Sequence, residues 1–561
     1  MTKQKLRVGL LLDGYAVPAW VYRMLEEILR SDYAELSLIV LNNTFQKPVR
    51  RSVFSRILRN YHHLASLAVR RWLEFIYAAL IERNSYVKNA NEITDCKLLL
   101  NDIPRFEVTP IQKRWSDYLS DNDVAVIEGY KLDILVRCGF RILRGNLLNA
   151  AKYGVWSFHH GDNRINRGGP AGFWETMENW PETGSVLQIL TEDLDNGKVL
   201  CRSFSCTNDM SVADNRSNYY WKSLFLLPRK MKELYDSEEK EFFARLEAQN
   251  KNPEFYSERL YTPPSNLKLA KLVSKKIWKK TTRIIASKLW FDQWILMFHI
   301  KEEFSSALWR YKPIMPPKDR FWADPHVVYR DGRYYIFIEE YLYSTGKGHI
   351  SLIVMDADGN YTEPELLIEK PYHLSYPSVF EFENNYYMIP ESTSNRTIEL
   401  YKCVEFPRKW KFHMNLMENV SAVDTTLIFH NDKWWMFTNV KEHESIANWD
   451  ELFLFSSQDL FSKNWRPHPR NPVVSDCKTA RPAGNLFYMN GSLYRPSQNC
   501  SRKYGYGFNI SEITAFDETD YSESLVSQVQ PNWSTRITGT HTFNRVESLH
   551  IIDALYRRRR F

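Results

Sequence analysis

A histidine and an aspartate in the first half of the sequence are placed to carry out acid–base chemistry together. His159 ends the apolar run 155–158, and Asp195 follows a second apolar run, 185–190. Both runs are typical of strands, and in an open α/β sheet the loops at the carboxyl ends of the strands carry the ligand chemistry. A histidine there can donate to an oxyanion or relay a proton, and a nearby carboxylate fixes its tautomer. We therefore expect His159 and Asp195 to share a site.

The segment before this pair predicts a doubly wound sheet. Arg7–Leu12 and Leu36–Leu41 have the pattern of buried strands, and they flank a helix-like segment, Trp20–Arg30. A strand–helix–strand opening of this kind is typical of a Rossmann-like α/β domain.

Several motifs around the pair match one known family in register. They are Ser157-Phe158-His159, Arg167-Gly168-Gly169-Pro170, Asp195-Asn196-Gly197 and the upstream Arg141-Ile142-Leu143. The segment resembles the catalytic core of the folate-dependent formyltransferases, the family of methionyl-tRNA, glycinamide ribonucleotide and sugar N-formyltransferases. Ser157 stands where that family has an Asn, and His160-Gly161-Asp162 replaces its Pro-Ser.

This resemblance implies an α/β Rossmann-like formyltransferase fold with N10-formyltetrahydrofolate as the cofactor. It also implies a role for each matching position: catalysis for His159, Asp195 and Ser157, contact with the pterin for Arg141, Ile142, Leu143 and Asp193, and contact with the acceptor for His160, Asp162 and Arg167. The Ser157 hydroxyl is a shorter donor than the family's amide. Losing one good oxyanion donor costs about 3 kcal/mol of transition-state stabilisation, so slow or altered chemistry is expected.

The second half of the sequence repeats one β pattern five times. The repeats begin at Ala323, Ser375, Ala422, Ala480 and Gly539. Each reads as two strands around a turn such as Asp331-Gly332. A period of about 50 residues in all-β sequence predicts propeller blades, here a five-bladed propeller. The region resembles the five-bladed propellers of glycoside hydrolase family 43, and more closely the propeller domain of plant glucosamine inositolphosphorylceramide transferases.

The repeat starts carry the residues that this second resemblance makes candidates. Asp324 matches the hydrolase base, but Tyr376 stands where the family has an Asp, and Asp424 where it has a Glu. Glycosidic hydrolysis needs a carboxylate pair, so the constellation is incomplete. We expect Asp324 and Asp424 to contact a sugar substrate without cleaving it, together with Glu391, Arg481 and His541.

Composition favours an ordinary globular protein in a reducing compartment. The chain has 561 residues, 44% of them hydrophobic and 25% charged. Its seven cysteines show no paired metal spacing, so we expect no metal site and no disulfide framework. Neither a signal peptide nor an 18-residue apolar run is recognisable. The expected location is the cytoplasm, or the periphery of a membrane at its inner face.

Two segments hold the excess of positive charge. Residues 47–83 and 266–300 carry net charges of +6 and +7, which sum to +13, whereas the whole chain is +7. The second segment is predicted to be an amphipathic helix, with Val273, Ile277 and Ile284 on one face. Such a helix binds an anionic membrane surface, or it covers a domain junction; the pattern fits both equally.

These patterns together predict three parts and one principal function. The parts are a formyltransferase-like domain at 1–240 with a basic helical insertion at about 44–85, a basic helical linker at 241–304, and a propeller at 305–561. The predicted function is transfer of a formyl group to an amino sugar, nucleotide sugar or lipid-linked glycan in cell-surface polysaccharide synthesis. The alternatives are a non-catalytic glycan-binding or scaffold protein, and a propeller-based glycosidase or glycosyltransferase. No nucleic acid partner is expected.

Overall fold

The chain divides into two compact units in the computed structural model. The structure describes residues 3–46, 61–82, 87–193 and 196–561. The first unit comprises Met1–Lys280 and the second Thr281–Phe561.

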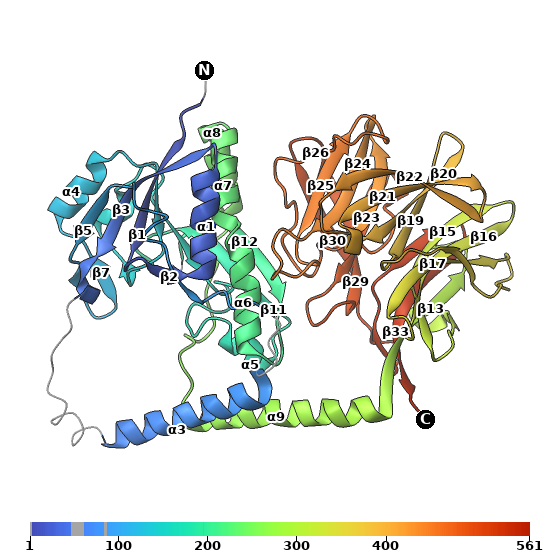
Figure 1. The fold of residues 1–561 in the computed structure, drawn as a ribbon, viewed down its shortest axis with the longest axis horizontal. Helices are drawn as coiled ribbons and strands as arrows, with labels where there is room; N and C mark the ends of the chain where they lie inside the picture. Colours follow the sequence, from blue (N-terminus) through green and yellow to red (C-terminus); the bar gives the residue numbers. More distant parts are fainter. Residues whose placement is uncertain (1–2, 47–60, 83–86, 194–195) are drawn as a thin grey trace. The chain divides into compact units, whose positions relative to one another are not determined.

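The first unit is built on a seven-stranded mixed sheet in the order β12-β11-β10-β8-β1-β3-β5 (Figure 1). Its strands are β1 (Leu6–Leu12), β3 (Ala34–Asn42), β5 (Arg105–Val108), β8 (Ile134–Arg137), β10 (Val155–His159), β11 (Glu182–Ile189) and β12 (Lys198–Cys206). The five strands from β10 to β5 run parallel, and β11 and β12 are antiparallel. A mixed sheet is therefore confirmed, whereas the doubly wound, Rossmann-like formyltransferase fold stays a prediction.

Helices and two small sheets surround this sheet. The helices are α1 (Ala19–Arg30), α3 (Tyr61–Tyr77), α4 (Asp121–Gly129), α5 (Phe173–Glu178), α6 (Val212–Ser223), α7 (Leu226–Asp236), α8 (Glu239–Gln249) and α9 (Asn266–Leu289), with short turns η1 (Asn43–Gln46), η2 (Ala78–Glu82) and η3 (Asn146–Asn149). The small sheets are β2 (Ala16–Pro18) with β4 (Ile93–Asp95), and β6 (Ile111–Gln112) with β7 (Ser116–Tyr118) and β9 (Ile142–Leu143). Helix α1 buries Trp20, Val21, Met24, Leu25 and Ile28 at helical spacing, as its apolar pattern predicts.

The second unit consists of five antiparallel sheets, the propeller-like arrangement that the repeats predict. The first four hold, in order, β15 (Arg320–Arg330), β16 (Arg333–Leu342), β17 (Lys347–Met355) and β18 (Glu365–Ile368); β19 (Ser375–Phe382), β20 (Asn385–Ser392), β21 (Thr397–Glu405) and β22 (Lys409–Glu418); β23 (Ala422–His430), β24 (Lys433–Val440), β25 (Leu452–Ser457) and β26 (Arg466–Pro467); and β27 (Phe487–Met489), β28 (Ser492–Asn499), β29 (Gly507–Phe516) and β30 (Tyr521–Val529). Short turns η4 (Leu308–Arg310) and η5 (Thr393–Asn395) connect strands.

The fifth sheet joins the two ends of the unit. It contains β13 (Trp290–Ile300) and β14 (Lys312–Ile314) from its start, and β31 (Ile537–Gly539), β32 (Phe543–Val546) and β33 (Leu549–Arg559) from its end. The predicted helix over 266–300 is therefore wrong beyond Leu289, because residues 290–300 pair along their whole length with β33. The ring begins at β13 rather than at residue 305.

A bulge marks the start of the first three sheets. Pairing between the first and second strands shifts register between Ala323 and His326 and at the equivalent places in β19 and β23. The central residues of these bulges, Asp324, Tyr376 and Asp424, have φ of 51°, 42° and 51°. Left-handed backbone is costly for residues other than glycine, so the ring holds these side chains in place against local preference.

A buried carboxylate ties together three strands of the first sheet. Glu340 Oε1 accepts from Arg320 Nη1 at 3.0 Å and from Trp322 Nε1 at 3.2 Å. Its Oε2 lies 2.8 Å from Ser351 Oγ and 3.1 Å from His349 Nε2. Burial opposes the charge, but these donors outweigh it and lower the pKa of Glu340 to about 2.

We expect Glu340→Gln to lower the free energy of unfolding by about 2–4 kcal/mol at neutral pH, because an amide places a donor against other donors. The wild-type carboxylate stabilises the fold fully above an unfolded pKa of about 4.3. That contribution disappears as pH falls towards 2, and the variant should lack this pH dependence. Urea unfolding between pH 2 and 7 measures both effects. Glu405→Gln, at an exposed ion pair with Lys409, is the control and should change stability little.

Candidate functional site

The starts of the five sheets bring together a cluster of buried polar side chains, here called the central cluster. From the first strand of each sheet, or the loop before it, come Asp324, Tyr376, Asp424, Arg481 and His541; from the strand paired with it come Glu339, Glu391, Asn439, Gln498 and Asp553. All of these are almost completely buried. Each sheet thus contributes one residue from each of two neighbouring strands.

One side of the central cluster is organised by Arg481. Its Nε lies 2.5 Å from Asp424 Oδ2, and its Nη2 lies 3.1 Å from Asp424 Oδ1 and 3.4 Å from Glu391 Oε2. Gln498 Nε2 donates to the same Asp424 Oδ2 at 2.7 Å. A bidentate guanidinium–carboxylate pair with an extra amide donor is a strong buried arrangement. It fixes the Asp424 carboxylate in one orientation.

The other side is a chain of alternating charges. His541 Nδ1 lies 2.5 Å from Asp553 Oδ2, and its Nε2 lies 3.8 Å from Asp324 Oδ1. Thr542 Oγ1 and the backbone N–H of Tyr376 donate to Asp324 at 2.9 and 3.2 Å. Asp324 is thus held by the adjoining sheets on both sides of its own.

Tyr376 completes this frame instead of supplying a carboxylate. Its hydroxyl accepts from the backbone N–H of Gly484 at 2.8 Å and lies 2.9 Å from Thr426 Oγ1. These contacts connect the second sheet to the third and the fourth. The missing carboxylate of the second sheet is supplied from the neighbouring strand by Glu391.

Burial and mutual repulsion divide the carboxyl groups into protonated and ionised forms. Burial and the charges of neighbouring carboxylates raise the pKa of Glu391 and Glu339 well above the usual range. Burial raises the pKa of Asp324 to about 6, against the opposing charge of His541. In contrast, the charge of His541 overcomes burial and holds the pKa of Asp553 below its usual value. A neutral carboxyl and an ionised one therefore coexist in the cluster near neutral pH.

Three of these residues have the types and spacing of a metal site. Ligand atoms of Asp324, His541 and Asp553 lie within 4.8 Å of one another. Burial lowers the pKa of His541, but the charges of Asp553 and Asp324 outweigh this and raise it. A charged imidazole does not bind a metal, so the trio fits an internal ion pair better than a cation site.

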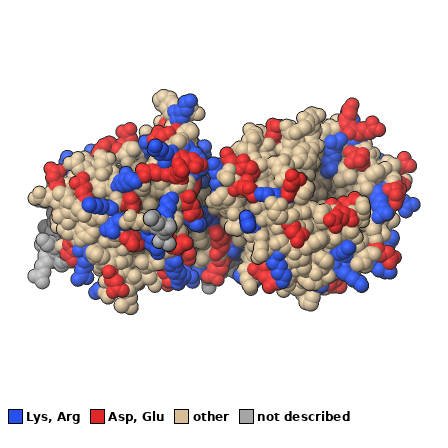
Figure 2. Space-filling view, turned by 90° about the horizontal axis from the view of Figure 1, so that it is seen from above, with Lys and Arg blue, Asp and Glu red and all other residues tan. Residues whose placement is uncertain are grey.

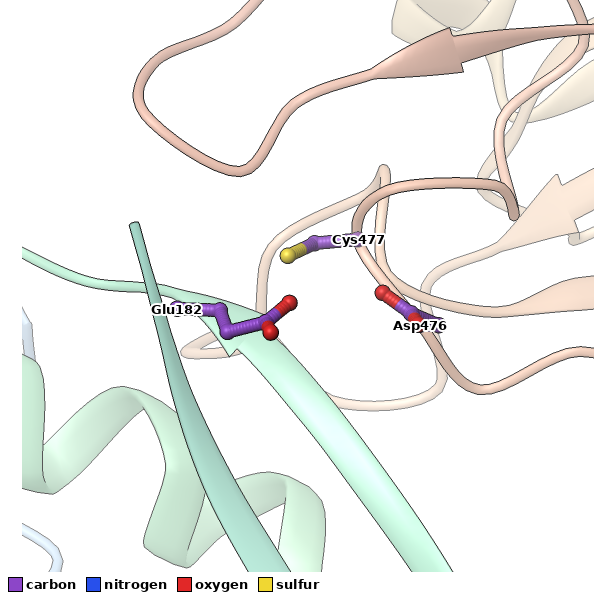
Figure 3. A group of neighbouring side chains, drawn as sticks. All are labelled: Glu182, Asp476 and Cys477. Atoms are coloured by element: carbon purple, nitrogen blue, oxygen red, sulfur yellow. The ribbon is translucent and has the colours of Figure 1, made fainter. Parts of the chain in front are cut away.

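Three further residues have side chains of types that bind metals, but they do not belong to one unit. Asp476 and Cys477 lie side by side on the loop between β26 and β27, whereas Glu182 begins β11 of the first unit (Figure 3). Only the adjacent pair belongs to the propeller-like unit.

Half-buried aromatic rings lie beside both cations of the cluster, Arg481 and His541. Tyr504 lies 4.9 Å from the Arg481 guanidinium and 5.3 Å from the His541 ring. Trp449 is 5.8 Å from Tyr504, and its buried indole N–H has no hydrogen-bond partner in the part of the chain that the structure describes. Trp294 stacks on His541 at 4.0 Å. Aromatic faces beside polar groups suit the apolar faces and hydroxyls of sugar rings.

In the first unit, the predicted residues around His159 belong to a buried hydrogen-bonded group. His159 Nε2 lies 2.6 Å from the backbone oxygen of Asn166, whose Nδ2 donates to Glu175 Oε1 at 3.1 Å. Burial raises the pKa of Glu175. Ser157 Oγ accepts from Arg137 Nη1 at 3.1 Å. Glu175 and Arg137 were missed because neither stands in a motif.

The other predicted residues of the first unit lie in several surroundings. Asp195 is outside the described residues, so its pairing with His159 stays a prediction, and Asp193 is exposed. Arg141 is bound to the buried Asp117 at 2.7 Å, beside Ile142 and Leu143 of β9.

His160, Asp162 and Arg167, the predicted acceptor contacts, do not form one group. His160 is buried among Trp20, Phe158 and Tyr220, and burial lowers its pKa well below the usual value. Asp162 forms an ion pair with Arg164 at 2.7 Å. Arg167 donates to the Asn163 backbone and lies over Tyr256.

The second unit resembles one family of transferases. Residues 315–555 match the protein-family model described as glucosamine inositolphosphorylceramide transferase 1, N-terminal. Glucosamine inositolphosphorylceramide transferase 1 of Oryza sativa subsp. japonica is 31% identical over 210 residues, 37% of this chain and 28% of the relative. The Arabidopsis thaliana protein is 30% identical over 212 residues, 36% of this chain and 27% of the relative. The chain thus spans less than a third of the length of the curated relatives it matches.

Similarities to solved structures are weaker. The family 117 glycoside hydrolase Zg3597 of Zobellia galactanivorans has a TM-score of 0.32 and 12% identity, covering 48% of this chain and 90% of the hydrolase. Glycinamide ribonucleotide transformylase 1 of Symbiobacterium toebii has a TM-score of 0.27 and 13% identity, covering 41% and 88%. Scores this low support no functional conclusion.

These comparisons correct the predicted activity. The prediction of formyl transfer to an amino sugar in polysaccharide synthesis is wrong, because the curated relatives are transferases of a different class, named for glucosamine and inositolphosphorylceramide. The names of these relatives also give no support to tetrahydrofolate, which the formyltransferase prediction implied. The predicted resemblance of the propeller to the plant transferases is confirmed for residues 315–555.

We expect Arg481→Met to lower the free energy of unfolding by about 3–5 kcal/mol, because it leaves Asp424 buried without its cation. Asp424→Asn should also destabilise the unit, and the double variant should lose less than the sum of the two losses. Urea unfolding of the four proteins measures this coupling. Arg408→Met, at an exposed pair with Glu365, should change stability little. Additive losses would show that the pair is not coupled.

Proposed function

We propose that the central cluster binds an amino sugar and that the chain takes part in sugar transfer to or from a glycosylated lipid. The observation that carries this proposal is the excess of carboxyl groups. Asp324, Glu339, Glu391, Asp424 and Asp553 stand against the cations Arg481 and His541. Carboxyl groups bind sugar hydroxyls by hydrogen bonds and bind an ammonium group through charge as well.

The same charge balance argues against phosphate as the group bound here. A phosphate would have to approach the buried carboxylates of Asp424 and Asp553, and like charges at short range are strongly unfavourable. Arg481 is already occupied by Asp424 and Glu391, and His541 by Asp553. A neutral or cationic polyol avoids this conflict, and the word glucosamine in the names of the curated relatives agrees with such a ligand.

Two further features support a ligand at this position. Both polar atoms of the Asn439 side chain are buried without a hydrogen-bond partner among the described residues. Asn439 pairs across the strands with Val423, next to Asp424. Trp449, half-buried, also lacks a partner for its indole N–H. Unpaired buried polar groups are costly, and sugar hydroxyls would satisfy them.

The central cluster contains both protonated and ionised carboxyl groups. This favours a second role, in which the cluster helps to form or break a glycosidic bond. A carboxyl group that keeps its proton, as Glu391 does, can give it to a leaving oxygen. A carboxylate whose pKa is close to neutral, as Asp324 has, can take one from an attacking hydroxyl. Glycosidic chemistry uses two carboxyl groups in these two states. The incoming oxygen would form its bond to the anomeric carbon as the leaving oxygen departs with the Glu391 proton.

Calorimetry with glucosamine, N-acetylglucosamine, glucose and inositol phosphate tests the binding proposal. We expect glucosamine to bind tightest and inositol phosphate weakest. Asp324→Asn should weaken glucosamine binding about tenfold, the value of one charge-assisted hydrogen bond. Asp358→Asn, on an exposed turn, is the matched control. Preference for inositol phosphate, or no change in Asp324→Asn, would refute the proposal. Release of a new sugar product by the wild type but not by Glu391→Gln would support the second role.

Binding of glucosamine should strengthen as pH rises from 5 to 7, because Asp324 loses its proton near pH 6 and gains the charge that attracts the ammonium group. Glucose, which carries no charge, should show a smaller change. In Asp324→Asn the pH dependence of glucosamine binding should shrink towards that of glucose. Equal pH profiles for wild type and variant would show that another group controls the titration.

A further inference from the structure

We propose that helix α3 and the part of helix α9 that belongs to the first unit, residues 266–280, form a surface that binds anionic lipid bilayers. This goes beyond the proposed sugar function and does not depend on it. The described helices include none with the length and apolar character needed to span a bilayer, so the contact proposed is with the membrane surface.

The two helices lie side by side and parallel (Figure 1). Asn266 Nδ2 donates to Ser66 Oγ at 3.0 Å near their starts, and Lys280 Nζ donates to the Leu80 backbone oxygen at 2.5 Å further along. Their inner sides share one apolar core, which contains Leu73, Tyr77, Leu269, Leu272, Val273, Trp174 and Met177. The pair is therefore a layer fixed to the rest of the unit.

The outer sides of the layer are rich in aromatic and aliphatic side chains. On α3, Trp72 and Phe75 are 62% and 69% exposed and lie three residues apart, on one face. On α9, Leu267 and Trp278 are 84% and 71% exposed. These two and Lys271 are spaced by four and seven residues, so they share the face opposite the buried residues.

The positive charge of α9 favours an anionic partner. The helix carries eight Lys or Arg residues and no Asp or Glu in its 24 residues. Of these, Lys276 is buried and two other lysines form ion pairs with carboxylates of neighbouring elements, so the remaining cations supply the outward charge. Lys271 and Lys275 are exposed beside the aromatic stripe. By contrast, the upper face of the first unit shows Lys and Arg interspersed with Asp and Glu (Figure 2). Helix α9 lies at the bottom of Figure 1, away from that face.

This combination identifies an anionic lipid surface as the occupant. A helix with Trp and Leu on its outer face and Lys at its flanks lies in the headgroup region, with its apolar side chains inserted and its amines on lipid phosphates. Two adjacent helices, each with a Trp on the outer face, give two anchors on one rigid layer. The charge and the aromatic anchors are the two contributions that such binding requires.

The test measures co-sedimentation of the full chain with vesicles of phosphatidylcholine, with and without phosphatidylserine. We expect binding only with phosphatidylserine, weakened by added salt because surface charge is screened. Trp72→Ser combined with Trp278→Ser should reduce partitioning tenfold or more. Lys271→Gln with Lys275→Gln should reduce it about tenfold and lessen the salt dependence. The wild-type tryptophan emission should shift to shorter wavelength on binding.

Matched controls come from the same unit. Trp115→Ser removes a tryptophan that is 66% exposed on a different element. Lys240→Gln with Lys251→Gln removes two exposed amines elsewhere. Both controls should bind as the wild type does, and unchanged circular dichroism would show that all variants are folded. The proposal is overturned if wild type fails to bind phosphatidylserine vesicles at low salt, or if the controls lose as much binding as the helix variants. Self-association of the wild type that the helix variants abolish, without vesicle binding, would instead show that the layer pairs with a second copy.

Discussion

The second unit depends on the pairing of its first strand with its last. All 11 residues of β13 are in register with β33, so a sheet assembled from segments about 250 residues apart closes the ring. Without this closure Thr542 would not lie beside Asp324, which would lose one of the two neighbours that hold it. The carboxyl groups at the centre repel one another, and only the closed ring keeps them close. Ring closure is thus the condition for the chemistry at the centre.

Much of the second unit is predictable from the sequence because each repeat carries its own hairpin. A short turn such as Asp331-Gly332 fixes the register of its two strands, and the repeat starts locate Asp324 and Asp424. The same hairpin register places Glu339 opposite Ala323 and Asn439 opposite Val423. These second-strand residues could have been found by counting outward from the turns. They were missed because their residue types differ from sheet to sheet.

Other features depend on contacts that no local pattern reveals. The run 290–300 follows a helix directly, and its alternation of apolar and polar residues is weak. Only its distant partner β33 makes it a strand. In the first unit, the strand–helix–strand opening is clear in the sequence. The partner of His159 is the backbone oxygen of Asn166, whose side chain in turn donates to Glu175, and both lie beyond the strand on a loop and helix whose path is set by tertiary packing. The apolar run 155–158 correctly predicted a strand that ends at His159, whereas the reaction inferred from the surrounding motifs was wrong. The pattern of residues around a strand end predicts where a side chain lies better than it predicts the reaction that the side chain serves.

The place of β33 in the ring has a consequence for biosynthesis. A ribosome makes β13 before the other strands of the second unit and its partner β33 last, so one edge of β13 lacks its partner while more than two hundred residues are added. During that interval β13 presents a long unpaired edge, the kind of edge that pairs wrongly with other strands. Helix α9 immediately precedes β13 and has already been made. A partner bound to α9 at this stage would keep the unpaired β13 away from other nascent chains until β33 has been synthesised.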